Sequence, residues 1–429
     1  MSSKRRNEKS DCRLRFLVPS LKEFGTDLEM TMISIRDLVT LSSPKDNTFF
    51  KMGESKQKYL FLYLRTGGGH LAPARSVAKY LSEQHGEEIT PVLIDGLAQA
   101  KSIARYVIED GYRMLQAKAK WYYEFLYATN KFLPIGYMNV AMANMFIKPY
   151  IHNVISEHRP AKIVVFHFFL IAPVYQVLAE LGLDIPVVTV VTDPFTAHPL
   201  WFQKKTQRYI VFSERLKHHC LNRGISDTSI QVFPFIIDEK FAATLPPEQI
   251  DEVRKNFGLA ATKKTVLIIG GGDGIPHGKR ILQSLLTAAL PAHIAIVCGK
   301  NKELFQEATE LQEQHPELLV FGFVDFVYEL LNVSDIVITK CGASTIMEIL
   351  MMKKIPVIID YLWEQELGNM EFVRDNNLGI FERDITKLPS IVRELCLDDA
   401  KYIMYHNNIE KIGVKNGTKD VGEFLRGEK

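Results

Sequence analysis

The chain has 429 residues, of which 47% are hydrophobic and 24% are charged. This is the composition of a globular protein with a sizeable core, and it excludes a disordered chain, a collagen and a coiled coil as overall descriptions. The length predicts about two to three domains rather than one small module. Lys and Arg number 52 against 50 Asp and Glu, so the formal net charge of +2 does not favour a general polyanion binder, and we expect no nucleic-acid partner.

The cysteines and the apolar stretches bear on the compartment. The five cysteines lie far apart with no CxxC pair, which argues against a disulfide framework or a zinc site. The basic amino terminus has no apolar stretch behind it, as a secretory signal would. The most apolar stretch, residues 163–192, is interrupted by charged residues and prolines and falls short of a transmembrane helix. We therefore expect a reducing compartment, and contact with a membrane only at its surface.

The first half of the chain alternates between strand and helix patterns. Residues 58–64 are apolar on both faces, as buried parallel strands are, and a glycine-rich loop, a helix over 71–81 and a strand over 89–94 follow. The pattern continues with strands at 162–166, 186–191 and 209–212 and helices at 172–181 and 214–222. This alternation is typical of a parallel sheet covered by helices.

The second half repeats this pattern after a break near residues 233–235 and a new helix from 245. The expected strands are 265–269, 293–297, 318–321, 336–339 and 356–359, with a helix through 290 after the first of them. The sequence thus predicts an α/β protein with two Rossmann-like domains facing a cleft. We place them at 58–235 and 245–400, with a C-terminal helical tail at 401–429 and an unassigned N-terminal extension at 1–57.

The glycine-rich loop that ends in His70 is the first candidate site. Glycines such as Gly68 and Gly69 let backbone amides approach a ligand, and the helix N-terminus that follows favours negative charge. His70 is suited to act there as a general base or to hold a charged group. A tight turn with an exposed histidine is the structural alternative.

The same loop also supports a dinucleotide-binding interpretation. Gly67, Gly69 and Ala72 match the Rossmann fingerprint, and Asp95 closes the next strand, near the position of a ribose-binding acid. An NAD-dependent oxidoreductase is therefore an alternative from this half alone. It does not account for the second half, where the glycines at 270–274 match a Walker P-loop only loosely.

Two strand-ending loops of the second half carry groups suited to a nucleotide-sugar. Small residues after the strand 336–339 can present backbone amides and hydroxyls to a diphosphate, and a glutamate one turn on can accept from a sugar hydroxyl. Acidic and amide side chains after the strand 356–359 suit sugar hydroxyls. A helix cap and a polar loop are the alternatives. The residues concerned are Gly342, Ser344, Thr345, Glu348, Gln365, Glu366 and Asn369.

The first half holds further candidates for an acceptor site. His167 and Asp193 each follow a strand, and His198 and Trp201 come soon after, although an isolated histidine is more often structural. Residues 97–150 are rich in aromatic and basic side chains, including Trp121 and Tyr122. Such segments can lie in the headgroup layer of an anionic membrane, and core helices are the alternative.

Taken together, these loops resemble glycosyltransferase family 28, and within it the monogalactosyldiacylglycerol synthases and the related bacterial diacylglycerol glucosyltransferases. The resemblance spans roughly residues 58–395. It rests on Gly67-Gly68-Gly69-His70, Trp121-Tyr122 to Thr129-Asn130, Val191-Thr192-Asp193, His198-Pro199, Trp201-Phe202, Gly270-Gly271-Gly272, Thr339-Lys340, Gly342, Thr345, Glu348, Gln365-Glu366 and Gly368-Asn369. Cys341 and Ala343 depart from the alanine and proline that the family often has, which leaves the donor sugar open.

This resemblance implies a glycosyltransferase B fold with the lipid acceptor at the first domain and a UDP-sugar at the second. It implies that the diphosphate and ribose contact Gly342, Thr345 and Glu348, and that Glu366 and Asn369 address the sugar or ribose. The remaining donor-binding residues expected are Gly271, Gly272, Ser344, Gln365 and, near the uracil, Phe323 and Val324.

The family inverts the anomeric centre by direct displacement, so His70 or Asp193 is expected to deprotonate the acceptor hydroxyl. We favour His70 because an imidazole titrates near neutral pH, although Asp193 is itself a candidate base. Helix-end amides and hydroxyls are expected to stabilise the departing diphosphate, so no DxD metal cluster is needed, and none stands in a fitting position. We therefore expect no metal and no cofactor.

The first hypothesis is a peripheral enzyme on the cytoplasmic face of the cell membrane. It would move galactose or glucose from UDP-galactose or UDP-glucose to 1,2-diacylglycerol at an anionic membrane surface. One alternative is a transferase that moves N-acetylglucosamine from its UDP donor to a lipid-linked peptidoglycan precursor. The others are an NAD-dependent oxidoreductase and a non-catalytic nucleotide-sugar sensor.

Overall fold

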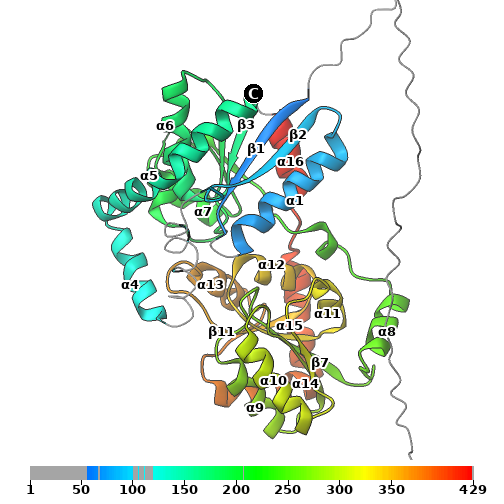
Figure 1. Cartoon of the computed structure of the whole chain (residues 1–429). Coiled ribbons are helices and arrows are strands. Elements are labelled where there is room, and N and C mark those ends of the chain that lie inside the picture. The colour runs from blue at the N-terminus through cyan, green and yellow to red at the C-terminus, as the bar shows by residue number, and fades with distance from the viewer. Residues whose placement is uncertain are drawn as a thin grey trace, which may run out of the picture. The chain divides into compact units, whose positions relative to one another are not determined.

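The computed structural model describes residues 56–65, 68–99, 105, 111, 119–205 and 207–427 (Figure 1). Residues 1–55 of the expected extension at 1–57, residues 66–67 of the glycine loop and most of 100–118 thus lie outside the described residues, whereas Gln57 already belongs to the first strand. The rest of the chain forms two six-stranded sheets in which all neighbouring strands are parallel. The predicted α/β architecture is confirmed.

The first sheet has the order β2-β1-β3-β4-β5-β6. Its strands are β1 (Gln57–Tyr63), β2 (Ile89–Asp95), β3 (Lys162–Val165), β4 (Val187–Val190), β5 (Arg208–Val211) and β6 (Ile230–Val232). Leu60, Phe61 and Leu62 of β1 are fully buried on both faces, which explains the unbroken apolar run in the sequence.

The second sheet has the order β12-β11-β10-β7-β8-β9. Its strands are β7 (Lys264–Ile269), β8 (Ala292–Val297), β9 (Leu319–Phe321), β10 (Ile336–Lys340), β11 (Ile355–Asp360) and β12 (Ile380–Phe381). The sequence analysis missed β6 and β12, which have three and two residues. Such short edge segments give too little periodicity to be recognised.

Helices cover both sheets. Those of the first half are α1 (Gly68–His85), α4 (Lys120–Asn130), α5 (Leu133–His158), α6 (Ile171–Leu181) and α7 (Glu214–Asn222), and α8 (Pro247–Asn256) precedes the second sheet. Those that follow are α9 (Gly278–Thr287), α10 (Lys302–Gln314), α11 (Val327–Val333), α12 (Ala343–Met351), α13 (Leu367–Asp375), α14 (Leu388–Leu397), α15 (Asp399–Ile412) and α16 (Thr418–Gly427).

Helix α1 begins at Gly68, three residues earlier than the sequence predicts, so His70 lies in its first turn and Pro73 lies inside it. This early start places the helix N-terminus, with its unpaired backbone N–H groups, at the end of the first sheet.

The last helix, α16, packs against α1 of the first half, as the red and blue ribbons show in Figure 1. Tyr80 Oη donates to Glu423 Oε1 at 2.7 Å, and His85 Nε2 lies 2.7 Å from the same oxygen. A Cβ added at Gly422 would lie 2.4 Å from the Tyr80 ring, so glycine permits this close approach. The C-terminal segment therefore runs from the second sheet, where Tyr402 lies 3.4 Å from Asp335, back to the first.

Candidate active site

A pocket of about 280 Å³ is lined by residues from both halves of the chain. They come from the start of α1, from the residues after β4, β7, β10 and β11, and from the starts of α12 and α13, and thus mainly from the carboxyl ends of parallel strands, where open α/β sheets bind ligands. Its lining is Gly69, His70, Ala72, Thr192, Asp193, Gly270, Gly271, Gly272, Asp273, Lys340, Gly342, Ala343, Ser344, Thr345, Glu348, Leu362, Gln365, Glu366 and Asn369.

Two helices begin at this pocket, α1 at its first-half wall and α12 at its second-half wall. The unpaired N–H groups and the dipole of a helix N-terminus favour an anion. Lys340, the last residue of β10, also lines the pocket, and its Cε lies 3.9 Å from where a Cβ of Gly271 would be. Gly271 has a φ of 89°, a conformation that favours glycine. The N-terminus of α12 and Lys340 are thus two groups of the second-half wall that favour a negatively charged ligand.

His70 is buried at the first-half wall. Its Nδ1 lies 2.8 Å from the hydroxyl of Thr192, and its ring centroid lies 4.6 Å from that of His167. Burial lowers the pKa of His70 to about 4, partly offset by a hydrogen bond with the Phe166 backbone. The imidazole is therefore neutral at pH 7, which differs from the titration near neutral pH expected from the sequence.

Asp193 faces the same pocket and shows the opposite shift. Burial raises the pKa of this carboxyl to about 7, and the charge of Glu366 adds to the rise. Hydrogen bonds from Trp201, whose Nε1 donates to Oδ2 at 3.0 Å, and from the Gln365 side chain act against it. The pocket thus holds a carboxyl group whose pKa lies near neutral pH.

The second-half wall carries polar groups with unused hydrogen-bonding capacity. Glu366 Oε2 accepts from the Leu362 N–H at 2.8 Å, and Asn369 Nδ2 donates to the Cys341 carbonyl at 2.9 Å. Among the described residues, the buried Asn369 Oδ1 and Ser344 Oγ have no hydrogen-bond partner. A ligand with both donors and acceptors, such as a sugar or a ribose, would satisfy these atoms.

Glu348 stands one turn into α12. Burial raises the pKa of its carboxyl to about 8, Lys240 opposes the rise and Asp238 adds to it. A carboxyl group that is neutral at pH 7 can both donate to and accept from a ribose, and it does not repel a phosphate.

Several residues expected at the site lie outside this pocket. His167 and Trp201 are buried behind it, with ring centroids 4.6 and 6.1 Å from that of His70. His198 is also buried, and its ring meets that of Tyr127 at 4.7 Å. Its Nε2 has no partner among the described residues.

Of the other expected residues, Trp121 and Tyr122 lie on α4 and are exposed, and Gly68 opens α1. Phe323 is exposed beneath Lys300, whose Nζ lies 5.2 Å from the ring centroid, and Val324 adjoins it. None of these five residues lines the pocket.

The sequence analysis did not single out Thr192, Lys340 or Asp273 as site residues. Each stands beside a residue or motif that it did identify, and each follows or ends a strand. The rule that ligands lie beyond the carboxyl ends of strands was the signal that would have found them.

Asp95, the expected ribose-binding acid of the dinucleotide alternative, has other partners. Its Oδ2 lies 3.1 Å from Arg65 and 3.0 Å from Arg105, and its Oδ1 accepts from the Leu97 N–H. It does not line the pocket. This geometry gives no support to an NAD site.

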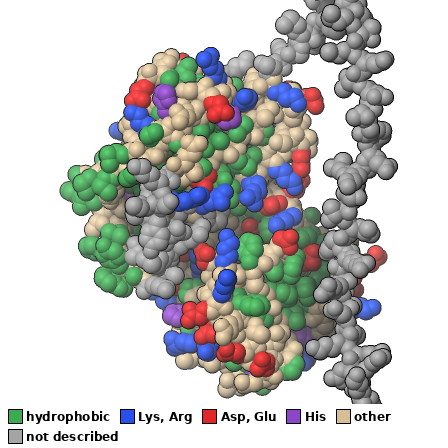
Figure 2. Space-filling view, viewed as in Figure 1, with side chains coloured by type: hydrophobic (Ala, Val, Ile, Leu, Met, Phe, Trp, Pro, Cys, Tyr) green, Lys and Arg blue, Asp and Glu red, His purple; other side chains and the backbone are tan. Residues whose placement is uncertain are grey.

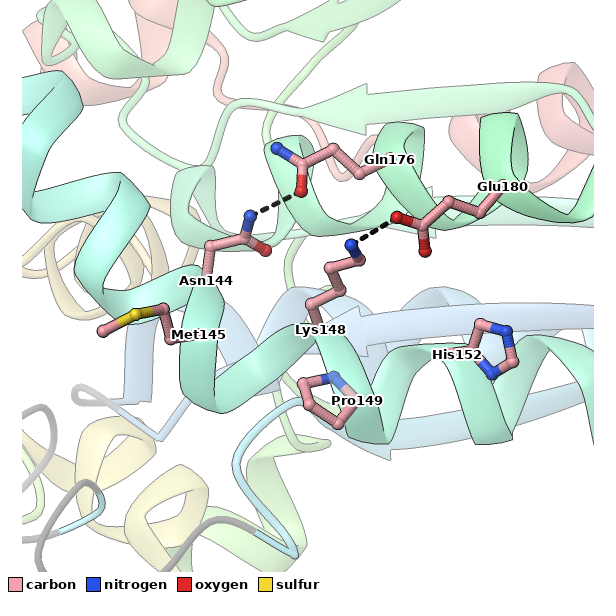
Figure 3. Close-up of a pocket in the computed structure, with 7 residues that line it drawn as sticks. All are labelled: Asn144, Met145, Lys148, Pro149, His152, Gln176 and Glu180. Carbon is pink, nitrogen blue, oxygen red and sulfur yellow. Dashed lines mark hydrogen bonds and ion pairs between the residues drawn. The ribbon is translucent and has the colours of Figure 1, made fainter.

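A second cavity lies between α5 and α6 (Figure 3). Figure 3 shows Asn144 facing Gln176 and Lys148 facing Glu180, and both pairs are hydrogen bonded. In this cavity the polar side chains bond one another across the two helices. The first pocket differs, because it lies mainly at the carboxyl ends of parallel strands, where open α/β sheets bind ligands.

In the described part of the chain, no group of three or more His, Cys, Asp and Glu side chains is placed to hold a metal ion. No helix of this part is both long and apolar enough to span a bilayer.

Known proteins share this fold. A Medicago truncatula protein solved with UDP-glucose superposes with a TM-score of 0.56 at 14% identity, over 87% of this chain and 98% of that one. The fold is that of the B class of glycosyltransferases.

The sequence comparisons identify the family. Residues 70–236 match the model of monogalactosyldiacylglycerol (MGDG) synthase, and residues 265–420 match the C-terminal domain of glycosyltransferase family 28. The chain belongs to this family, in the group of MGDG synthases and diacylglycerol glucosyltransferases.

Two relatives illustrate the group. A probable chloroplastic MGDG synthase of Nicotiana tabacum is 28% identical over 80% of this chain, which spans 65% of that protein's length, less than two thirds of it. A processive diacylglycerol beta-glucosyltransferase of Bacillus pumilus is 25% identical over 86% of this chain and 95% of its own length.

Proposed function

We propose that the protein is an inverting glycosyltransferase that moves a hexose from UDP-galactose or UDP-glucose to the hydroxyl of 1,2-diacylglycerol. The observation that carries this proposal is that one pocket brings His70 and Asp193 together with the amides, hydroxyls and lysine of the second half. The names of the two relatives point to the same acceptor and to these two sugars.

The second half is suited to bind the donor. The N-terminus of α12 and Lys340 would hold the diphosphate, and they stabilise the negative charge that grows on it as it leaves. Ser344 and Thr345 can donate to its oxygens, while Glu348 meets the ribose. Glu366 and Asn369 address the sugar. Because these groups stabilise the leaving diphosphate by themselves, transfer is proposed to proceed without a metal or another cofactor.

The first half is suited to activate the acceptor. A UDP-sugar brings two negative charges into the pocket, and such charges raise the pKa values of both His70 and Asp193. His70 would rise from about 4 towards neutrality and remain an unprotonated base, whereas Asp193 would rise from about 7 and become protonated. We therefore assign the base to His70, and to Asp193 a neutral carboxyl that hydrogen-bonds the sugar or the acceptor.

The reaction is then one displacement. His70 takes the proton of the diacylglycerol hydroxyl as the oxygen bonds to the anomeric carbon. The bond from that carbon to the UDP oxygen breaks on the opposite face, and UDP leaves with the electron pair. The configuration at the anomeric carbon inverts.

The helices α4 and α5 favour an acceptor at a membrane surface. More than half of the large apolar side chains that are exposed among the described residues belong to these helices and their connection. Figure 2 shows hydrophobic side chains gathered over this region. They are Trp121, Tyr122, Phe125, Phe132, Ile135, Tyr137, Met138, Met142, Met145 and Phe146. Such a surface fits a peripheral enzyme that lies on an anionic bilayer, here proposed to be the cytoplasmic face of the cell membrane.

The test incubates the purified chain with diacylglycerol in anionic mixed micelles and, separately, with UDP-galactose or UDP-glucose, with and without EDTA. Lipid products are identified by mass spectrometry and the anomer by NMR. A β-linked monohexosyl diacylglycerol that forms in EDTA is the expected result and names the sugar. UDP binding without any lipid product would reject the proposed transfer, and activity lost in EDTA would reject the metal-free reaction.

A further inference from the structure

Helix α4 and the residue after it contact the loop between β11 and α13. Lys131 Nζ forms an ion pair with the Glu364 carboxylate, and the Trp363 N–H donates to Glu124 Oε1 at 3.1 Å. The first half thus reaches across to the second at two neighbouring positions of one loop, residues 362–366.

The same loop is held from a second side. The hydroxyl of Thr196, which follows β4, lies 3.1 Å from the carbonyl oxygens of Glu364 and Gln365. Glu364 has a φ of 62°, a left-handed conformation that is unfavourable for a residue other than glycine. Since such a conformation persists only where surrounding contacts impose it, the contacts with the first half shape this loop.

The loop carries groups that face the pocket directly. Gln365 and Glu366 line it, and the Gln365 side chain hydrogen-bonds Asp193. The position of the loop therefore sets how Gln365 and Glu366 stand beside Asp193.

We propose that Lys131 and Glu124 are positioning residues, which hold the loop at 362–366 so that Gln365 and Glu366 are correctly placed for the donor sugar. This inference rests on the proposed function, because it assigns these two residues to that same reaction. The lipid-facing helix α4 is thereby linked to the donor half of the site.

The experiment compares Lys131→Met, Glu124→Gln and Glu364→Gln with the wild type in the transfer assay. A partly exposed ion pair or hydrogen bond contributes at most about 1 kcal/mol, so each change should lower kcat/KM for the UDP-sugar about two- to fivefold. The melting temperature should stay unchanged, since the side chains of Lys131 and Glu364 are 39% and 28% exposed. The exchange Lys131→Glu with Glu364→Lys should restore kcat/KM to within about twofold of wild type.

Two variants distinguish a positioning role from an effect on membrane binding and from a general effect of ion pairs between the halves. Glu364→Gln removes a negative charge and cannot weaken attraction to an anionic membrane, so a loss in this variant is not a loss of membrane binding. Arg215→Gln breaks another ion pair between the halves, from α7 to Glu371 of α13 at 2.7 Å, and should leave kcat/KM unchanged.

The inference is overturned if the three variants match wild type, if Arg215→Gln lowers kcat/KM as much as they do, or if the charge exchange fails to restore it. Failure of the proposed function would look different, because the wild type itself would then give no lipid product.

Discussion

Glu348 leads to a pH dependence of donor binding that can be worked out from its environment. Burial raises the pKa of this carboxyl to about 8, so it is neutral below that pH and ionised above it, where its charge would repel the bound diphosphate. At pH 9 only about one molecule in eleven keeps the neutral form. The affinity for UDP should therefore be about tenfold weaker at pH 9 than at pH 7. Isothermal titration calorimetry at pH 7, 8 and 9 measures this change.

The matched control is Glu348→Gln, which replaces the neutral carboxyl by an amide of the same shape. This variant should bind UDP at pH 7 within about threefold of wild type and keep that affinity at pH 9. Because the pKa of Asp193 is raised to about 7 in the same pocket, the series is repeated in Asp193→Asn to separate its ionisation. A wild-type affinity that does not change between pH 7 and 9, or an equal decline in Glu348→Gln, would refute the reasoning.

Three further predictions concern the proposed base, the packing of α16 and the exposed apolar surface of α4. His70→Ala should lower the transfer rate in single-turnover assays at least about 100-fold with UDP affinity unchanged. Asp193→Asn keeps a neutral hydrogen-bonding group and should lower the rate less. If Asp193→Asn lowers the rate more than His70→Ala does, the base is Asp193 and not His70. Gly422→Val should lower the free energy of unfolding in urea by about 1–3 kcal/mol, because a Cβ at this position would lie 2.4 Å from the Tyr80 ring of α1. The control Gly427→Val should leave it unchanged, because a Cβ there meets nothing within 4 Å. Trp121→Ser should weaken sedimentation with anionic vesicles without lowering the melting temperature, because this side chain is 72% exposed; unchanged sedimentation would contradict membrane contact there.

Most of the fold could be predicted because its strands are buried on both faces. Runs such as 58–64 and 265–269 are apolar after their first residue, and they correspond to β1 and β7 within one residue at each end. The early start of α1 was not predictable from periodicity, since glycines carry no apolar pattern. The packing of α16 on α1 depends on a contact between Tyr80 and Glu423, 343 residues apart, which no local pattern encodes.

The site could be predicted as a set of residues but not as a set of protonation states. Strand-ending loops identified His70 and Asp193, and the structure places both at one pocket. Their pKa values depend on burial and on neighbours such as Glu366, which come from distant parts of the chain. The sequence could only assign ordinary values, by which His70 titrates near neutral pH and Asp193 is ionised, and the structure shifts both.

Each half of the site is ambiguous by itself, and the contacts between the halves resolve the ambiguity. The loop around His70 fits a dinucleotide fingerprint, and the start of α12 fits an ordinary helix cap. The first half offers a base that can activate an acceptor hydroxyl, and the second half offers a site for the diphosphate of a sugar donor. Transfer needs the hydroxyl and the sugar side by side, so neither half is suited to it without the other. The hydrogen bond from the Trp363 N–H to Glu124 joins the two halves, and the two residues are 239 positions apart in the sequence. Because the loop at this contact also carries Gln365 and Glu366, a movement that parts the two halves would separate the proposed base from the proposed donor site. We therefore expect the proposed transfer to depend on closure of the two halves around both substrates.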